Sequence, residues 1–222
     1  MRKLSINSFI TLDGVMQAPG GPDEDNSGGF QHGGWSVNYW DNLMGQIMGD
    51  YMSKPFELLL GRKTYEIFAS HWPYSTEEPA AKILNSVKKY VVSKKLNTVD
   101  WNNSFLLRGD IVEEIKKLKS QNGPFIQVHG SINLIQTLLK NNLADEIQLW
   151  TFPVTVGRGK RLFGDGTIPV GFKLLESRIS ETGVIISTYK PDGDLRTGSF
   201  ALENPTEAEL KRRKNLKVES NL

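Results

Sequence analysis

The sequence predicts an α/β domain in which a mixed, mostly parallel sheet lies between helices. Strand-like and helix-like segments alternate along most of the chain, which is typical of parallel sheets. Several of the strand-like segments are continuous apolar runs, as expected for strands buried on both faces. The last two, residues 173–180 and 184–190, flank Glu181-Thr182-Gly183, which predicts an antiparallel hairpin. We expect this domain to span residues 1–191, followed by a charged tail over residues 192–222.

The first strand is expected over residues 3–11, where apolar and polar residues alternate loosely. A stretch rich in Gly, Pro, Asp, Asn and Ser then runs from Asp13 to Gly34. Loops of this length inside compact domains are commonly active-site lids or disordered segments. A helix is expected over residues 37–53, because apolar residues recur there at helical spacing.

Shorter elements fill the middle of the chain. Apolar runs predict strands, and segments such as residues 111–119, with Ile111, Ile115 and Leu118 on one face, predict helices. The expected strands are 56–60, 88–92, 104–107, 125–128 and 144–152, and the expected helices are 64–68, 79–86, 111–119 and 131–140.

The composition limits the classes of function. The net charge of +2 comes from 27 basic and 25 acidic residues, a balance that argues against a nucleic-acid-binding surface. The absence of cysteine excludes disulfides, thiolate metal sites and a cysteine nucleophile. Polar residues interrupt the apolar residues of the N-terminus, so neither a signal peptide nor a membrane span is predicted. We expect a cytoplasmic protein that binds neither nucleic acid nor membrane.

The tail contains the densest basic run, Lys211-Arg212-Arg213-Lys214. Upstream of it, Asn204-Pro205-Thr206-Glu207 predicts a helix start, with Asn204 as the cap and proline in the first helical position. Basic residues are expected in the last turn of a helix because they complement its dipole. We therefore favour a solvated tail helix over a nucleic-acid contact.

Three junctions at strand ends are typical of phosphate sites. They are Gly61-Arg62-Lys63-Thr64, Ser93-Lys94-Lys95 and Gly130-Ser131-Ile132-Asn133. Free backbone N–H groups at a helix start attract an anion, glycine permits close approach, and the side chains add donors. Each glycine alone indicates no more than a tight bend. Three junctions in one domain predict a ligand with several phosphates, such as a dinucleotide phosphorylated on its adenosine ribose.

Other common sites are not supported. A P-loop needs a further glycine where position 56 holds phenylalanine, and Gly157-Arg158-Gly159 lacks the third glycine of the Rossmann fingerprint. His32, His71 and His129 are isolated, so no metal site is predicted. The chain also has no Gly-x-Ser-x-Gly elbow of hydrolases.

Five segments between Leu4 and Lys190 match one known family. They are Ser8 to Gly14, Leu60 to Glu66, Val91 to Lys94, Val128 to Leu134, and Asp145 to Phe163, which is the most specific. Together they resemble the dihydrofolate reductase-like three-layer α/β/α fold, and most closely the reductase domain of bacterial riboflavin biosynthesis, the RibD C-terminal domain family. That resemblance implies an NADPH-dependent reductase, commonly a homodimer, in which strand 144–152 or 184–190 would supply the dimer edge.

The resemblance also implies roles for individual residues. The nicotinamide should lie near Ile10, Asp13 and Gly14, and cationic side chains beside the ribose would favour NADPH over NADH. The adenosine side and its extra phosphate would be held by Gly61, Arg62, Lys63, Thr64, Ser93 and Lys94, and the pyrophosphate by Gly130, Ser131, Ile132 and Asn133.

Reduction by hydride transfer also needs a proton. A flat heterocycle would in addition pack against a flat surface. The helix that corresponds to the one carrying the pterin-binding carboxylate in dihydrofolate reductases offers Asp41 as the first candidate for the proton donor and Asp50 as a less favoured one, and Asp13 is a further candidate. Asp41 would otherwise be a solvated helix carboxylate. Trp35, Tyr39 and Trp40 would form an aromatic wall for a heterocycle, or anchor the long loop.

The substrate is left open by the sequence. Residues 67–74 lack the arginine-containing motif that grips a phosphoribosyl group in riboflavin-pathway reductases, and the Trp-Asn-Leu-Pro arrangement of dihydrofolate reductases is absent. Two hypotheses follow: an NADPH-dependent reductase of a small, flat, electron-poor heterocycle, or a non-catalytic NADPH-binding protein with a regulatory or stress-related role.

Overall fold

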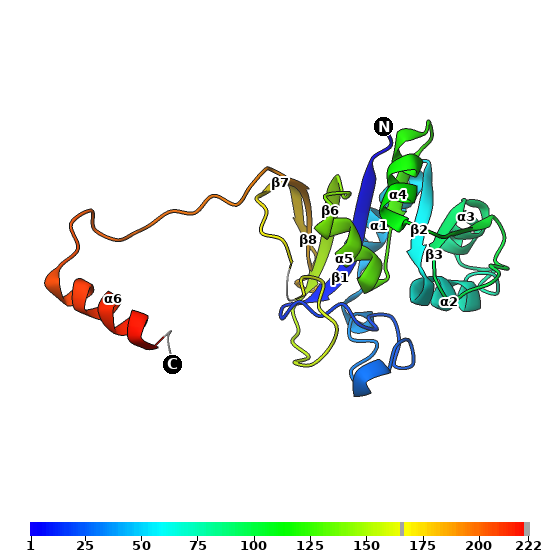
Figure 1. The fold of residues 1–222 in the computed structure, drawn as a ribbon. Coiled ribbons are helices and arrows are strands. Elements are labelled where there is room, and N and C mark those ends of the chain that lie inside the picture. Colours follow the sequence, from blue (N-terminus) through cyan, green and yellow to red (C-terminus); the bar gives the residue numbers. More distant parts are fainter. Residues whose placement is uncertain (165–166, 220–222) are drawn as a thin grey trace.

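An eight-stranded sheet with the order β4-β3-β2-β5-β1-β6-β8-β7 forms the centre of the structure (Figure 1). The computed structural model describes residues 1–164 and 167–219. The strands are β1 (Leu4–Thr11), β2 (Phe56–Gly61), β3 (Lys89–Val92), β4 (Ser104–Leu107), β5 (Phe125–Val128), β6 (Glu146–Phe152), β7 (Phe172–Ile179) and β8 (Ile185–Pro191).

The strands β1 to β6 pair in parallel, and β8 pairs antiparallel with both β6 and β7. The mixed sheet and its terminal hairpin are therefore as predicted. Because β1 to β6 run in the same direction, their carboxyl ends meet at one edge of the sheet. This edge brings the three predicted phosphate junctions together.

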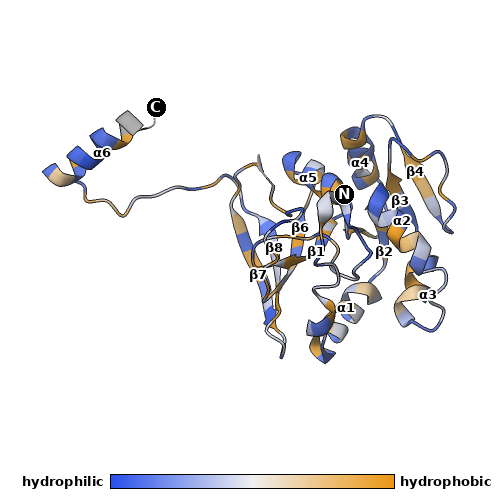
Figure 2. Ribbon diagram, turned by 90° about the horizontal axis from the view of Figure 1, so that it is seen from below, coloured by the Kyte–Doolittle hydropathy of each residue, from blue (hydrophilic) through white to orange (hydrophobic). Residues whose placement is uncertain are grey.

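Helices cover both faces of the sheet (Figure 2). In β1, Leu4, Ile6 and Ile10 point to the face covered by α4 and α5, and Phe9 points to the opposite face, where α1 lies. The helices are α1 (Asn42–Ser53), α2 (Arg62–His71), α3 (Pro79–Ser86), α4 (Ile111–Ser120), α5 (Ile132–Lys140) and α6 (Glu207–Glu219). The three-layer arrangement follows from the alternation of side chains along each strand.

Two of the expected helices differ from those observed. The helix expected over residues 37–53 begins only at Asn42, after a 3₁₀ turn over Val37–Tyr39. Asp41 causes this start, because its carboxylate accepts a hydrogen bond from the backbone N–H of Met44 at 2.9 Å and caps the helix. Conversely, α2 is longer than the expected 64–68, since it begins directly after Gly61.

The expected dimer edge was placed wrongly. Both β6 and β8 have neighbours on each side, so neither is available for pairing with a second chain. The edge strands are β4 and β7, and Leu174, Leu175 and Ile179 on β7 are exposed. Homodimer formation itself stays a prediction, with β7 as the strand that offers this edge.

The tail helix α6 stands away from the sheet in Figure 1. Its cap is Thr206 rather than Asn204, because the Thr206 hydroxyl accepts a hydrogen bond from the backbone N–H of Glu209 at 3.3 Å. Glu209 in turn pairs with Arg212 and Arg213, which places two of the basic side chains in intrahelical ion pairs. Within the described part of the chain, none of the helices has the length and apolar character needed to cross a membrane.

Candidate active site

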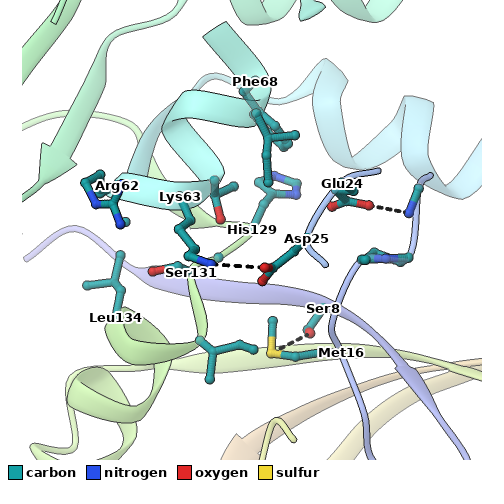
Figure 3. A pocket seen from close by; sticks show the side chains of 18 of the residues that line it. Ser8, Met16, Glu24, Asp25, Arg62, Lys63, Phe68, His129, Ser131 and Leu134 are labelled. Carbon is teal, nitrogen blue, oxygen red and sulfur yellow. Dashed lines mark hydrogen bonds and ion pairs between the residues drawn. The ribbon is translucent and has the colours of Figure 1, made fainter. Parts of the chain in front are cut away.

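A cavity of about 1790 Å³ opens at the carboxyl edge of the sheet. It is lined by the ends of β1, β2, β3 and β5, by the starts of α2 and α5, and by residues 16–25 of the long loop. Figure 3 shows part of it, with Lys63 and Ser131 on one side and Met16 and Glu24 on the other. Pockets for one small ligand usually measure about 300–1000 Å³. This cavity is therefore large enough for two ligands side by side.

Two of the predicted phosphate junctions interlock. A Cβ atom placed on Gly61 would lie 2.1 Å from the hydroxyl oxygen of Ser131, and one on Gly130 would lie 2.4 Å from that of Thr64. The backbone N–H of Gly61 also donates a hydrogen bond to the carbonyl of Gly130 at 3.1 Å. Glycine at both positions thus allows the starts of α2 and α5 to lie against each other.

The starts of α2 and α5 differ from those of α1 and α4. In α1 and α4 an aspartate caps the helix, Asp41 and Asp110 respectively. At α2 the cap residue is Gly61, which has no side chain, and at α5 the Ser131 hydroxyl makes no capping hydrogen bond. Two helix starts at one cavity therefore present backbone N–H groups without a side-chain cap, an arrangement that favours a bound anion.

A carboxylate from the long loop occupies the cationic part of the cavity. Asp25 pairs with the ammonium of Lys63 at 3.0 Å and also with Lys160, and the Ser27 hydroxyl lies 3.1 Å from Lys63 and 2.5 Å from Lys160. We call these four residues the loop latch. Burial alone would raise the pKa of Asp25, but the hydrogen bonds from Lys160, Ser27 and Lys63 hold that pKa well below its ordinary range. The position beside Lys63 therefore accepts an anion.

We expect Asp25→Asn to open the loop latch, because the amide cannot pair with two ammonium groups. Hydrogen exchange of the backbone amides of residues 20–29 should become about 10-fold faster, as for a loss of about 1.4 kcal/mol in local stability. In the wild type the latch should persist above pH ~4, the ordinary Asp pKa, and weaken only as the pH falls through the lowered pKa of Asp25.

Asp23→Asn is the matched control for the loop latch, because Asp23 lines the same cavity, is exposed and has no ion pair within the described ranges. Its hydrogen exchange should match that of the wild type. Equal exchange in the Asp25→Asn and Asp23→Asn proteins would show that the latch does not hold the loop.

The other residues predicted to hold the adenosine phosphate and the pyrophosphate all line the cavity, but they are engaged to different degrees. Arg62 forms an exposed ion pair with Glu66 at 2.8 Å, and the Ser93 hydroxyl accepts hydrogen bonds from the backbone N–H groups of Lys95 and Leu96. Lys94 is exposed and, across residues 1–164 and 167–219, makes no ion pair. Lys95 is also exposed, lines the cavity and makes no ion pair within the described ranges, so Lys94 and Lys95 are both accessible to a ligand phosphate.

The predicted proton donors Asp41, Asp50 and Asp13 do not line the cavity. Asp41 caps α1, as described above, and the Met44 backbone N–H lowers its pKa. Asp13 accepts hydrogen bonds from the Thr11 hydroxyl at 2.5 Å and from the backbone N–H of Gly157 at 2.8 Å. Burial would raise the pKa of Asp13, but these donors lower it. The carboxylates of Asp41 and Asp13 stabilise local structure.

Among the remaining predicted residues, only Trp40 lines the cavity. Trp35 and Tyr39 pack edge-on against Phe152, so they anchor the long loop to the sheet rather than form a wall. Ile10 belongs to the buried core, and Gly14, with a φ of +77°, forms a tight turn after β1. Trp40 lines the cavity beside Phe9, and the two ring centroids lie 6.1 Å apart; Phe68 and Trp72 line it as well.

Sequence reasoning missed several titratable residues of the cavity, among them Glu24 and His129. Glu24 accepts a hydrogen bond from the backbone N–H of Gly20 at 2.6 Å, and burial raises its pKa. Burial also lowers the pKa of His129 to about 4, and this neutral ring lies 3.0 Å from the Gln127 side-chain oxygen. The position of His129 beside Gly130 is a signal that could have found it, whereas no motif marks Glu24.

The sequence matches one family model over most of its length: residues 2–186 match the RibD C-terminal domain. The chain is also 30% identical over 196 residues to the uncharacterized protein YyaP of Bacillus subtilis (strain 168), covering 86% of this chain and 96% of YyaP.

Solved structures with less sequence identity share the fold. A protein assigned to riboflavin biosynthesis from Shewanella sp. PV-4 superposes with a TM-score of 0.61 at 22% identity, covering 86% of this chain and 99% of its own. A pyrimidine reductase-like protein from Corynebacterium diphtheriae gives 0.58 at 13% identity, covering 87% and 93%. Dihydrofolate reductase from Enterococcus faecalis, solved with NADP(H), gives 0.53 at 14% identity, covering 86% and 96%. The dihydrofolate reductase-like fold is thereby confirmed.

Proposed function

Because the chain belongs to the RibD C-terminal domain family, we propose that it is an NADPH-dependent reductase of a small, flat heterocycle. The observation that carries this proposal is the pair of interlocked helix starts, α2 and α5, which leave uncapped N–H groups beside cationic side chains in one cavity. A phosphorylated dinucleotide matches that set of donors. The solved relatives described as pyrimidine reductase-like and as dihydrofolate reductase support a heterocyclic substrate.

The residues of the cavity fit NADPH. Arg62, Lys63, Thr64 and Lys94 would hold the adenosine phosphate, and Ser131 with the first turn of α5 would hold the pyrophosphate. NADPH supplies the hydride when bound. To bind a phosphate beside Lys63, the protein would exchange the Asp25 carboxylate for it, so cofactor binding would move the long loop.

Glu24 is our candidate for the side chain that supplies the proton. It lines the cavity and its pKa is raised by burial, which keeps part of the carboxyl group protonated at higher pH than an ordinary glutamate. Asp13 and Asp41 lack both properties.

Charge reversal at Lys94 tests the cofactor. We expect Lys94→Glu to weaken NADPH binding at least ~10-fold and to leave NADH binding nearly unchanged, because the new carboxylate would repel only the additional phosphate. Fluorescence titration of both nucleotides measures this difference. Lys82→Glu makes the same charge change on the exposed face of α3, outside the cavity, and should bind NADPH like the wild type. Equal NADPH affinity in the two variants would contradict the assignment of Lys94.

A second function is favoured by one specific observation. None of the carboxylates that were predicted as proton donors lines the cavity, which is consistent with a protein that binds NADPH without reducing a substrate. The two functions differ in NADPH oxidation measured with a panel of pterins, pyrimidines and quinones. Saturable NADPH binding without oxidation by any member of the panel would favour the non-catalytic protein.

A further inference from the structure

Asn7 has an unusual environment. It lies in β1 on the same face as Phe9, is only 3% exposed, and lines the cavity. Both the oxygen and the nitrogen of its side-chain amide are buried, and neither has a hydrogen-bond partner in the part of the chain that the structure describes. A buried primary amide can donate two hydrogen bonds and accept two, so its bonding capacity is unused.

The polar residues on the neighbouring strands already have hydrogen-bond partners. Gln148, opposite Asn7 in β6, lies 3.4 Å from the Thr188 hydroxyl and accepts a hydrogen bond from the Trp150 indole at 3.2 Å. Gln127 in β5 donates to the carbonyl of Tyr51 at 3.2 Å and lies 3.0 Å from the His129 ring. The sheet therefore satisfies its other buried amides and leaves that of Asn7 facing the cavity.

An unpartnered buried amide destabilises the folded protein, and leucine of almost the same size would avoid this cost. From the position of Asn7 in the cavity we infer that its amide binds the planar amide edge of a ligand, accepting from the ligand N–H and donating to the ligand carbonyl. The rings of Phe9 and Trp40 line the same cavity and suit a flat group. Asn7 would thus determine which ligand the cavity accepts.

Two ligands could supply this amide edge. One is the carboxamide of the nicotinamide in the proposed cofactor, and the other is a lactam in the ring of the heterocyclic substrate. The inference rests on the proposed function for both sources, because the carboxamide belongs to the proposed cofactor and the lactam to the proposed substrate. Lumazine, a flat pteridine with N–H groups beside its carbonyls, serves as the probe for the second, and 1,3-dimethyllumazine lacks those N–H groups.

The experiment compares the wild type with Asn7→Leu by calorimetric titration and thermal unfolding. We expect Asn7→Leu to raise the melting temperature by ~2–4 °C, because an unsatisfied amide is removed. We also expect it to weaken binding of one of the two probes, NADP⁺ or lumazine, by ~10- to 100-fold, because two hydrogen bonds are lost. Adenosine 2′,5′-bisphosphate, which has no nicotinamide, should bind both proteins equally. Weaker binding of NADP⁺ by Asn7→Leu identifies the carboxamide as the ligand group. Weaker binding of lumazine by Asn7→Leu identifies the lactam, provided that the wild type binds 1,3-dimethyllumazine weakly.

Asn85→Leu is the matched control for stability. The Asn85 amide donates to the carbonyl of Trp72 at 2.9 Å and accepts from the Trp101 indole at 2.6 Å, so the same substitution there should lower the melting temperature. A lower melting temperature for Asn7→Leu, or wild-type affinity of that variant for both probes, would overturn the inference. If the wild type fails to bind adenosine 2′,5′-bisphosphate, the proposed cofactor is wrong, and lumazine titrated without cofactor still decides the role of Asn7.

Discussion

Gly61→Ala is expected to reduce NADPH affinity by at least ~100-fold and to lower the free energy of unfolding by about 1–3 kcal/mol. The backbone of Gly61 has a φ of −75°, which alanine adopts without strain, so the effect is purely steric. The added Cβ would lie 2.1 Å from the Ser131 hydroxyl oxygen and 2.9 Å from the Ser131 backbone nitrogen. It would therefore push apart the two helix starts that together form the proposed phosphate site.

The measurement is a fluorescence titration of NADPH at a temperature where thermal unfolding shows that the variant is folded. Gly49→Ala is the control, because Gly49 lies in α1 with open space around it, and alanine there should raise stability by about 0.5–1 kcal/mol without changing affinity. Combining Gly61→Ala with Ser131→Gly removes the hydroxyl and the Cβ that the new methyl group meets, so the double variant should regain part of the affinity. Wild-type affinity in the single variant would contradict the interlocked arrangement.

The fold class and most of its elements were predictable because the local sequence patterns match the elements that form. Short, mostly apolar runs located β4 and β5 with their observed ends, and the Glu181-Thr182-Gly183 turn located the β7–β8 hairpin. Sheet order was not predictable in the same way, since it depends on contacts between distant segments. That is why strands β6 and β8 were expected at an edge although each lies between two neighbours.

The candidate site likewise contains residues that the local sequence predicts and residues that only the folded chain identifies. Residues beside the junction glycines, such as Thr64 and Ser131, were predicted to face one ligand and do line one cavity, because helix starts after parallel strands share an edge. The position of a carboxylate in the chain is not tied to the sheet edge in this way. Asp41 and Glu24 both carry a carboxyl group, and the sequence does not distinguish their roles. Only the contacts of the folded chain show that Asp41 caps a helix and that Glu24 lines the cavity.

At the opposite, amino edge of the sheet, we expect Glu57→Met to lower the free energy of unfolding by about 3–5 kcal/mol. Arg2 and Glu57 form a 2.5 Å ion pair in which the Arg2 side chain is only 3% exposed, and Arg2 also donates to the carbonyl of Pro124 at 2.7 Å. Without Glu57, the buried guanidinium keeps only the neutral Pro124 carbonyl as acceptor among the described residues, and the starts of β1, β2 and β5 lose their shared contact. The melting temperature should fall by roughly 10 °C.

Glu176→Met makes the same replacement in the exposed Arg178–Glu176 pair, where both side chains are 60% exposed, and should change stability by less than about 1 kcal/mol. Arg2→Met combined with Glu57→Met should be less destabilising than the sum of the two single changes, because no unpaired charge is then buried. Glu57 and Gly61 lie four residues apart in β2, Glu57 near the amino end of the strand and Gly61 at its carboxyl end. If the amino edge serves stability and the carboxyl edge serves binding, Glu57→Met will bind NADPH with wild-type affinity while it is folded, and Gly61→Ala will not. A large loss of affinity in folded Glu57→Met would show that the two edges are coupled through β2.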